Sequence, residues 1–112
     1  MTKTKLHIGT LEDMGDRFVD AWSRARIGED IDERHVTFPT WEAMTKAVTG
    51  KRLEMLRHLR AHEEKSIRAL SLSLKRDYRR VHEDVTILRS AGLISAEGLT
   101  VVCDRIQAEI EI

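Results

Sequence analysis

Two adjacent arginines, Arg79 and Arg80, lie in a segment whose apolar residues recur at helical spacing, and Glu83 follows about one turn later. A guanidinium group neutralises phosphate, and near the start of a helix it can also donate two hydrogen bonds to O6 and N7 of guanine. The carboxylate of Glu83 can accept a hydrogen bond from the cytosine amine or orient an arginine. These residues predict a helix face that reads base pairs in the major groove of DNA.

A second group of polar residues precedes this face in the sequence and suits the phosphate backbone. Helix N-termini and the basic side chains beside them bind phosphate, which positions a protein on DNA without reading its sequence. We expect such contacts from Ser66, Arg68, Lys75 and Arg76.

Three further residues of the same helix are ambiguous or face inward. Tyr78 lies at the edge of the apolar stripe, where core packing and a phosphate contact fit equally well. His82 fits a DNA contact or packing at the edge of the core, and we favour the core. Asp84 falls on the buried side, where it is expected to pair with a basic residue rather than meet DNA.

The formal net charge is zero, which would normally count against nucleic-acid binding, but the charge is unevenly distributed. Residues 51–94 hold 11 lysines and arginines against 6 acids, together with three of the five histidines. Residues 1–50 hold 7 basic against 9 acidic residues, and residues 95–112 hold 1 against 4. A solvated helical surface explains the charge equally well, so the pattern of elements must decide between the two readings.

The spacing of apolar residues predicts three helices around this basic block. The first begins at Thr49 or Gly50 and ends near Ala61, the second is short and capped by Ser66, and the third is longer and capped by Asp77. The expected inward residues are Leu53, Leu56 and Leu59 in the first helix, Ile67, Leu70 and Leu74 in the second, and Tyr78, Val81, Val85 and Leu88 in the third.

A hairpin is expected after the third helix. Gly92 can end the helix, Leu93 and Ile94 begin an extended segment, and residues 95–98 are typical of a turn. The β-branched residues within 99–103 predict a returning strand that includes Cys103. A short helix, a tight turn, a longer helix and a hairpin are the order of a winged helix-turn-helix.

The N-terminal part predicts a strand, a helix, a second strand and a short helix. In the opening strand Leu6 and Ile8 lie on one face, with Lys3, Lys5 and His7 exposed on the other. A helix runs from a cap at Thr10 to Gly28, an acidic loop follows over residues 29–33, and residues 35–38 form a short strand before Pro39. Thr40 caps the last helix. Trp22 and Trp41 lie on apolar stripes and are expected to be core or interface anchors.

Strict alternation of apolar and polar residues over 105–112 predicts a final strand. If it pairs with the opening strand, its Glu109 and Glu111 can lie opposite Lys3 and Lys5. The pairing can occur within one chain or between two, or the strand can extend the hairpin of a monomer. We favour exchange between two chains, because helix-turn-helix proteins usually read two-fold operators as dimers.

Several other classes of function are not expected. No run approaches the roughly 20 apolar residues of a membrane span, and no signal-peptide core is present, which favours a cytoplasmic location. The lone Cys103 excludes an internal disulfide and a cysteine zinc site. His58 and His62 are four residues apart, but Leu59 stands where a zinc peptidase motif needs Glu. No catalytic triad, phosphate loop or carboxylate pair is recognisable, so we expect no enzyme activity, metal or cofactor.

Three segments, 66–70, 77–85 and 88–94, resemble the winged helix-turn-helix transcriptional regulators of the MarR-like group. Residues 8–18 resemble the opening of small regulators that are similar to antitoxins paired with RelE-like ribonuclease toxins. The resemblance implies an autoregulating antitoxin with a toxin partner. Lys75 stands where the family often has Gly in the turn, so it is expected to adopt a left-handed conformation.

These observations predict a mainly helical α+β fold with a strand-helix extension over residues 1–48 and a winged helix-turn-helix domain over residues 49–112. The expected function is sequence-specific binding of double-stranded DNA as a homodimer. The extension would form dimer contacts, hold a basic toxin through its acidic balance, or merely enlarge the core. The alternative is a protein-interaction module that uses the winged helix only as a scaffold.

Overall fold

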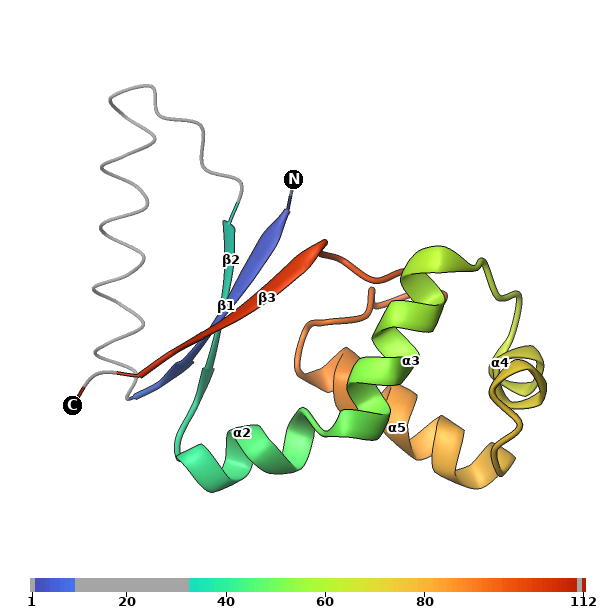
Figure 1. Ribbon diagram of the computed structural model, residues 1–112, viewed down its shortest axis with the longest axis horizontal. Coiled ribbons are helices and arrows are strands. Elements are labelled where there is room, and N and C mark those ends of the chain that lie inside the picture. The colour runs from blue at the N-terminus through green and yellow to red at the C-terminus, as the bar shows by residue number, and fades with distance from the viewer. Residues whose placement is uncertain (1, 10–32, 111) are drawn as a thin grey trace.

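The computed structural model describes residues 2–9, 33–110 and 112, and it has an α+β fold (Figure 1). The predicted helix from Thr10 to Gly28, with Trp22, lies outside the described residues, as does most of the predicted acidic loop. The described elements are strands β1 (Lys3–Ile8) and β2 (Glu33–Phe38), helices α2 (Trp41–Ala47), α3 (Gly50–Ala61), α4 (Ile67–Leu74) and α5 (Tyr78–Ser90), and strand β3 (Arg105–Glu109).

The three described strands form one parallel sheet in the order β2-β1-β3. Figure 1 shows this sheet beside the helices α3, α4 and α5, with α2 leading from β2 into α3. The final strand therefore pairs with the opening strand, as predicted, but it does so within the chain. The exchange between two chains that we favoured is not what joins these strands, and β3 does not extend the hairpin either.

The register of the sheet corrects the expected charge pairing. Lys3 lies opposite Arg105, Lys5 opposite Gln107, and His7 opposite Glu109. The parallel direction places the like charges of Lys3 and Arg105 together at the start of the strands, and the residue opposite Glu109 is not a lysine. His7 Nδ1 instead lies 3.8 Å from Glu109 Oε2.

The opening strand, β1, has buried residues on both of its faces, whereas its alternating pattern predicted one buried and one exposed face. Leu6 is buried as expected, but His7 and Thr4 are buried too, with 7% and 0% of their surface exposed. Because β1 is the central strand, side chains of both neighbours contact it, and the His7 ring stacks on that of His35 in β2 and lies beside Glu109 in β3. Alternation alone does not identify a central strand.

All four described helices begin at residues that suit a helix N-terminus. The side-chain oxygens of Thr40, Thr49, Ser66 and Asp77 accept hydrogen bonds from the third backbone amide that follows, over 3.1, 3.3, 3.0 and 3.2 Å respectively. Such caps satisfy amides that have no partner inside the helix. Local chemistry therefore fixes where each helix begins.

The core lies among α3, α4, α5 and the segment that follows them. Met55 and Leu70 are completely buried, and Met55 was missed by the sequence interpretation although it lies on the inward face of α3. Tyr78 and Trp41 are 46% and 49% exposed, so neither packs in the core, which leaves a phosphate contact for Tyr78 and an interface for Trp41 as the remaining expectations. The buried cluster consists of Met55, Leu56, Leu59, Leu70, Val81, Val85, Leu88, Leu93, Ile94 and Cys103.

The hairpin after α5 is smaller than predicted. Gly92, with φ +78°, ends the helix region as expected, and Leu93 and Ile94 are buried. The predicted strand over residues 99–103 is wrong, since the hairpin is closed by a single antiparallel bridge between Ile94 and Val101. Cys103 is buried in a segment that is not a strand.

One arginine of α5 binds the turn of the hairpin. Arg89 donates from Nε to the carbonyl of Ser95 over 3.0 Å and from Nη2 to the carbonyl of Gly98 over 2.5 Å. Both carbonyls belong to the turn, so the side chain ties the turn to α5. Beside the turn, the amide of Ser95 donates to the carbonyl of Thr100 over 2.9 Å and that of Val102 donates to the carbonyl of Leu93 over 3.2 Å, around the Ile94–Val101 bridge.

Candidate nucleic-acid interface

The tight turn between α4 and α5 orients the candidate residues. Lys75 ends α4 in the left-handed conformation, with φ 54° and ψ 46°, as expected from its place in the turn. The amide of Lys75 donates to the carbonyl of Leu72 over 3.2 Å, and that of Arg76 donates to the carbonyl of Ser71 over 3.1 Å. Asp77 then caps α5, which begins at Tyr78, three residues after Lys75.

Helix α5 has one buried face and one exposed face. Val81, Val85 and Leu88 are completely buried. Arg79 and Arg80 are exposed, and so is Glu83 one turn later. Within the part of the chain that the structure describes, no ion pair occupies either arginine. Two guanidinium groups and a carboxylate thus project from the face of α5 that is opposite the core.

An aromatic contact joins α4 to the same face. The guanidinium carbon of Arg68 lies 5.9 Å from the centre of the Tyr78 ring, within the range of a cation–π contact. The Tyr78 and His82 rings are 6.0 Å apart. His82 is exposed, so the packing at the core edge that we favoured for it is wrong. The two rings extend the exposed basic surface toward Arg68 instead.

The other residues expected to contact the DNA backbone are of two kinds, those whose polar side chains are exposed to solvent and those whose side chains are bound within the protein. Ser66 is exposed, but its hydroxyl already caps α4. Lys75 is exposed at the turn, so its ammonium group is accessible to a phosphate. Arg76 is different, because its Nη2 donates to Asp84 Oδ2 over 2.8 Å and its side chain is only 22% exposed. Arg76 is therefore turned away from solvent and is not a free phosphate contact.

Asp84 holds this part of the fold together through two arginines. Arg52 donates from Nε to Asp84 Oδ1 over 3.0 Å, while Arg76 binds the other oxygen. Arg52 also donates to the carbonyls of Lys46 and Ala47 at the end of α2. The network links α2, α3, the turn and α5. Pairing of Asp84 with a basic residue was predicted, but Arg52 as a partner was not.

The histidines at the C-terminal end of α3, His58 and the C-cap His62, contact each other and a nearby acid. His58 Nε2 lies 2.8 Å from Glu64 Oε1, and its ring lies 4.8 Å from that of His62. The hydrogen bond from His58 is the main cause that lowers the pKa of the Glu64 carboxyl, with a second hydrogen bond from Ser73. Among residues 2–9, 33–110 and 112, no three His, Cys, Asp or Glu side chains are grouped as metal ligands.

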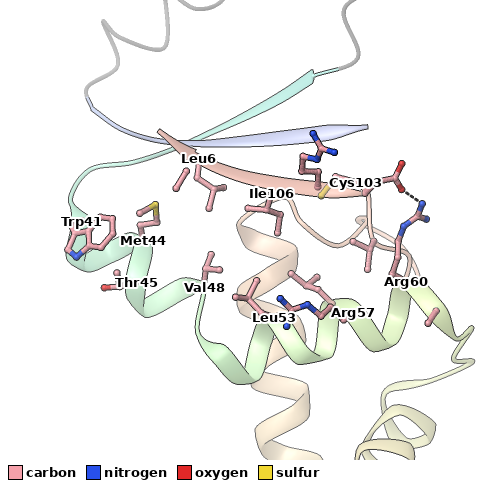
Figure 2. A pocket seen from close by; sticks show the side chains of 16 residues that line it. Leu6, Trp41, Met44, Thr45, Val48, Leu53, Arg57, Arg60, Cys103 and Ile106 are labelled. Carbon is pink, nitrogen blue, oxygen red and sulfur yellow. Dashed lines mark ion pairs between the residues drawn. The ribbon is translucent and has the colours of Figure 1, made fainter. Parts of the chain in front are cut away.

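A second feature is a pocket of about 650 Å³ between the sheet and the helices α2 and α3 (Figure 2). Figure 2 shows Leu6 and Ile106 on the sheet side, facing Leu53 on α3. Trp41 lies at one end with about half of its surface exposed. The walls of this pocket are therefore mainly apolar.

The charged residues of the pocket lie away from Trp41, toward the C-terminal end of α3. Three arginines, Arg57, Arg60 and Arg105, line it together with a single acid, Asp104. Arg60 forms an ion pair with Asp104, drawn as a dashed line in Figure 2. The charged residues that line the pocket are therefore mainly basic, whereas residues 1–50 contain more acidic than basic residues.

None of the described helices is long and apolar enough to cross a membrane. The sequence model of the HVO_A0114 family matches residues 47–108, more than half of the chain. The match covers α3, α4, α5, the hairpin and nearly all of β3, and so includes the exposed basic face and the Asp84 network. No curated protein and no solved structure matches the chain.

Proposed function

The chain belongs to the HVO_A0114 family, and we propose that it is a transcriptional regulator that binds double-stranded DNA through the outward face of α5. The observation that supports this proposal is the exposure of Arg79, Arg80 and Glu83 on a helix whose other face is buried in the core. Guanidinium groups in this position suit guanine, and the carboxylate suits cytosine or a neighbouring arginine.

The proposed DNA-binding domain is a winged helix-turn-helix over residues 49–112. Its support is the succession of α4, a tight turn, the longer α5 and a small hairpin closed at Ile94 and Val101. In such domains the second helix enters the major groove. The protein would act by binding alone in the cytoplasm, without catalysis or a cofactor.

The candidate residues take different roles in this proposal. Arg68 and Lys75 contact phosphates, because they flank the reading helix and are exposed. Tyr78 and His82 lie between Arg68 and the reading face, where they can donate hydrogen bonds to the backbone. Arg76 positions the turn through Asp84 and does not touch DNA.

The dependence of binding on salt tests the proposal. The protein is titrated against DNA from the promoter region of its own gene, and anisotropy gives the binding constant at several salt concentrations. Each neutralised phosphate contributes a slope of about −0.9, so the phosphate contacts of Arg68 and Lys75 predict a slope of about −2 for each bound copy of the chain. Scrambled DNA of equal length should bind more weakly with a similar slope. Absence of binding, or binding that is indifferent to salt, contradicts the proposal.

A partner-binding role is the second candidate, and the pocket beside Trp41 favours it. In this role the chain is an antitoxin, and a small ribonuclease toxin inserts an apolar segment between the sheet and α3. The arginines of the pocket suit carboxylates on that segment, so the pocket itself does not suit the basic partner first expected.

Co-expression with the neighbouring gene product tests this second role. Trp41→Ala should abolish co-purification of the partner, because a half-exposed tryptophan beside an apolar pocket is a typical binding hot spot. Leu72→Ala is the matched control, since Leu72 is 73% exposed but does not line the pocket. Equal co-purification with both variants would remove the pocket from consideration as the partner site.

A further inference from the structure

Strand β3 is an edge strand of the described sheet, with β1 on one side only. The amide of Arg105 donates to the carbonyl of Thr2, so the backbone groups of Arg105 point toward β1. Backbone direction alternates along a strand, and the amides and carbonyls of Ile106 and Ala108 therefore point to the open edge. Unpaired edge groups are a template for another strand.

The sequence of β3 is complementary to itself when it is paired in the opposite direction. With a two-fold axis at Gln107, Arg105 of one copy lies opposite Glu109 of the other, and Ile106 lies opposite Ala108. This register pairs all five residues of β3 with one another. It gives two Arg–Glu pairs by symmetry, and opposite charges across a strand pair are stabilising.

The direction of the backbone groups agrees with this register. Ile106 and Ala108 carry the outward amides and carbonyls, so they form the hydrogen-bonded pairs of an antiparallel ladder. Arg105 and Glu109 then form non-hydrogen-bonded pairs, in which the side chains approach most closely. The side chain of Glu109 is 48% exposed, which leaves it accessible beyond its contact with His7.

We propose that a second copy of this chain binds at β3, joining the two sheets antiparallel about Gln107. Residues directly opposite each other share a face of the sheet, so the two-fold axis runs perpendicular to it and the helices of both copies lie on the same side. Such a dimer would suit a two-fold operator; only this last step rests on the proposed DNA-binding function.

The mass in solution tests the dimer. The wild-type protein should have about twice the 12.9 kDa of one chain. Arg105→Glu and Glu109→Arg should each raise the dimer dissociation constant roughly tenfold, because each places like charges opposite one another twice. The double variant, Arg105→Glu with Glu109→Arg, should restore the dimer. Arg34→Glu on the other edge strand, β2, is the matched control and should change nothing.

Cross-linking tests the register separately. In a Cys103→Ser background, Gln107→Cys should form a covalent dimer on oxidation, since the two cysteines would meet at the axis. Ala108→Cys should cross-link much less. A monomeric wild-type protein, failure of the double variant to recover the dimer, or cross-linking at 108 in preference to 107 overturns the proposal. A monomer that still binds promoter DNA would overturn the dimer alone.

Discussion

Replacing both Arg79 and Arg80 with alanine is expected to abolish the preference for the operator over unrelated DNA. Each arginine that forks onto a guanine discriminates by about 1–3 kcal/mol, so the pair accounts for at least a 30-fold loss of affinity for the operator. Affinity for unrelated DNA should fall much less, because the remaining basic side chains still contact phosphates. Competition between operator and scrambled DNA measures both quantities.

Two controls separate base reading from loss of charge. Arg68→Ala should weaken operator and scrambled DNA by the same factor, since Arg68 lies on α4 and contacts the backbone in the proposal. Arg57→Ala should leave both unchanged, because Arg57 lines the pocket on α3. If the double variant loses affinity equally for both DNAs, α5 does not read sequence.

The helix starts could be predicted because each depends on a few neighbouring atoms. Thr40, Ser66 and Asp77 accept hydrogen bonds from amides three residues ahead, and the same spacing is visible in the sequence. The inward residues of α5 also follow from helical period alone, as the complete burial of Val81 and Val85 shows. These features need no knowledge of distant parts of the chain.

Features that depend on distant contacts were missed or misplaced. The parallel pairing of β1 with β3 joins residues about a hundred positions apart, and the burial of His7 depends on its contacts with both neighbouring strands, His35 of β2 and Glu109 of β3. The predicted strand over 99–103 had suitable residues, but Arg89 of α5 holds the preceding turn. Strand propensity says nothing about such a contact.

The candidate DNA-binding residues also fall into those whose exposure follows from local helical spacing and those whose exposure depends on contacts with other parts of the chain. Exposure of Arg79, Arg80 and Glu83 follows from helical period, and the structure agrees with it. The exposure of Tyr78 could not be predicted in this way. Its position lies at the edge of an apolar stripe, and whether such a side chain is buried or exposed depends on the neighbouring helix. Whether Arg76 is free depends likewise on Asp84, eight residues away in the sequence.

The largest loss of stability is expected from Asp84→Ala. Asp84 is 8% exposed and binds two arginines whose side chains are themselves 12% and 22% exposed. Removing one partner of a buried pair leaves an uncompensated charge and lowers the free energy of unfolding by about 3–5 kcal/mol. Since both arginines retain some contact with water, we expect about 3 kcal/mol. Urea unfolding of the variant and the wild type measures the difference.

Two further variants test whether the unpaired positive charge, rather than the loss of any carboxylate, destabilises the protein. Glu83→Ala, next to Asp84 but exposed, should change the free energy of unfolding by no more than about 0.5 kcal/mol. If stranded positive charge is the cause, then Arg76→Ala should destabilise less when Asp84 is already alanine than when Asp84 is present. Additive effects of the two substitutions would show that Asp84 and Arg76 act independently, in contradiction to the 2.8 Å contact between them.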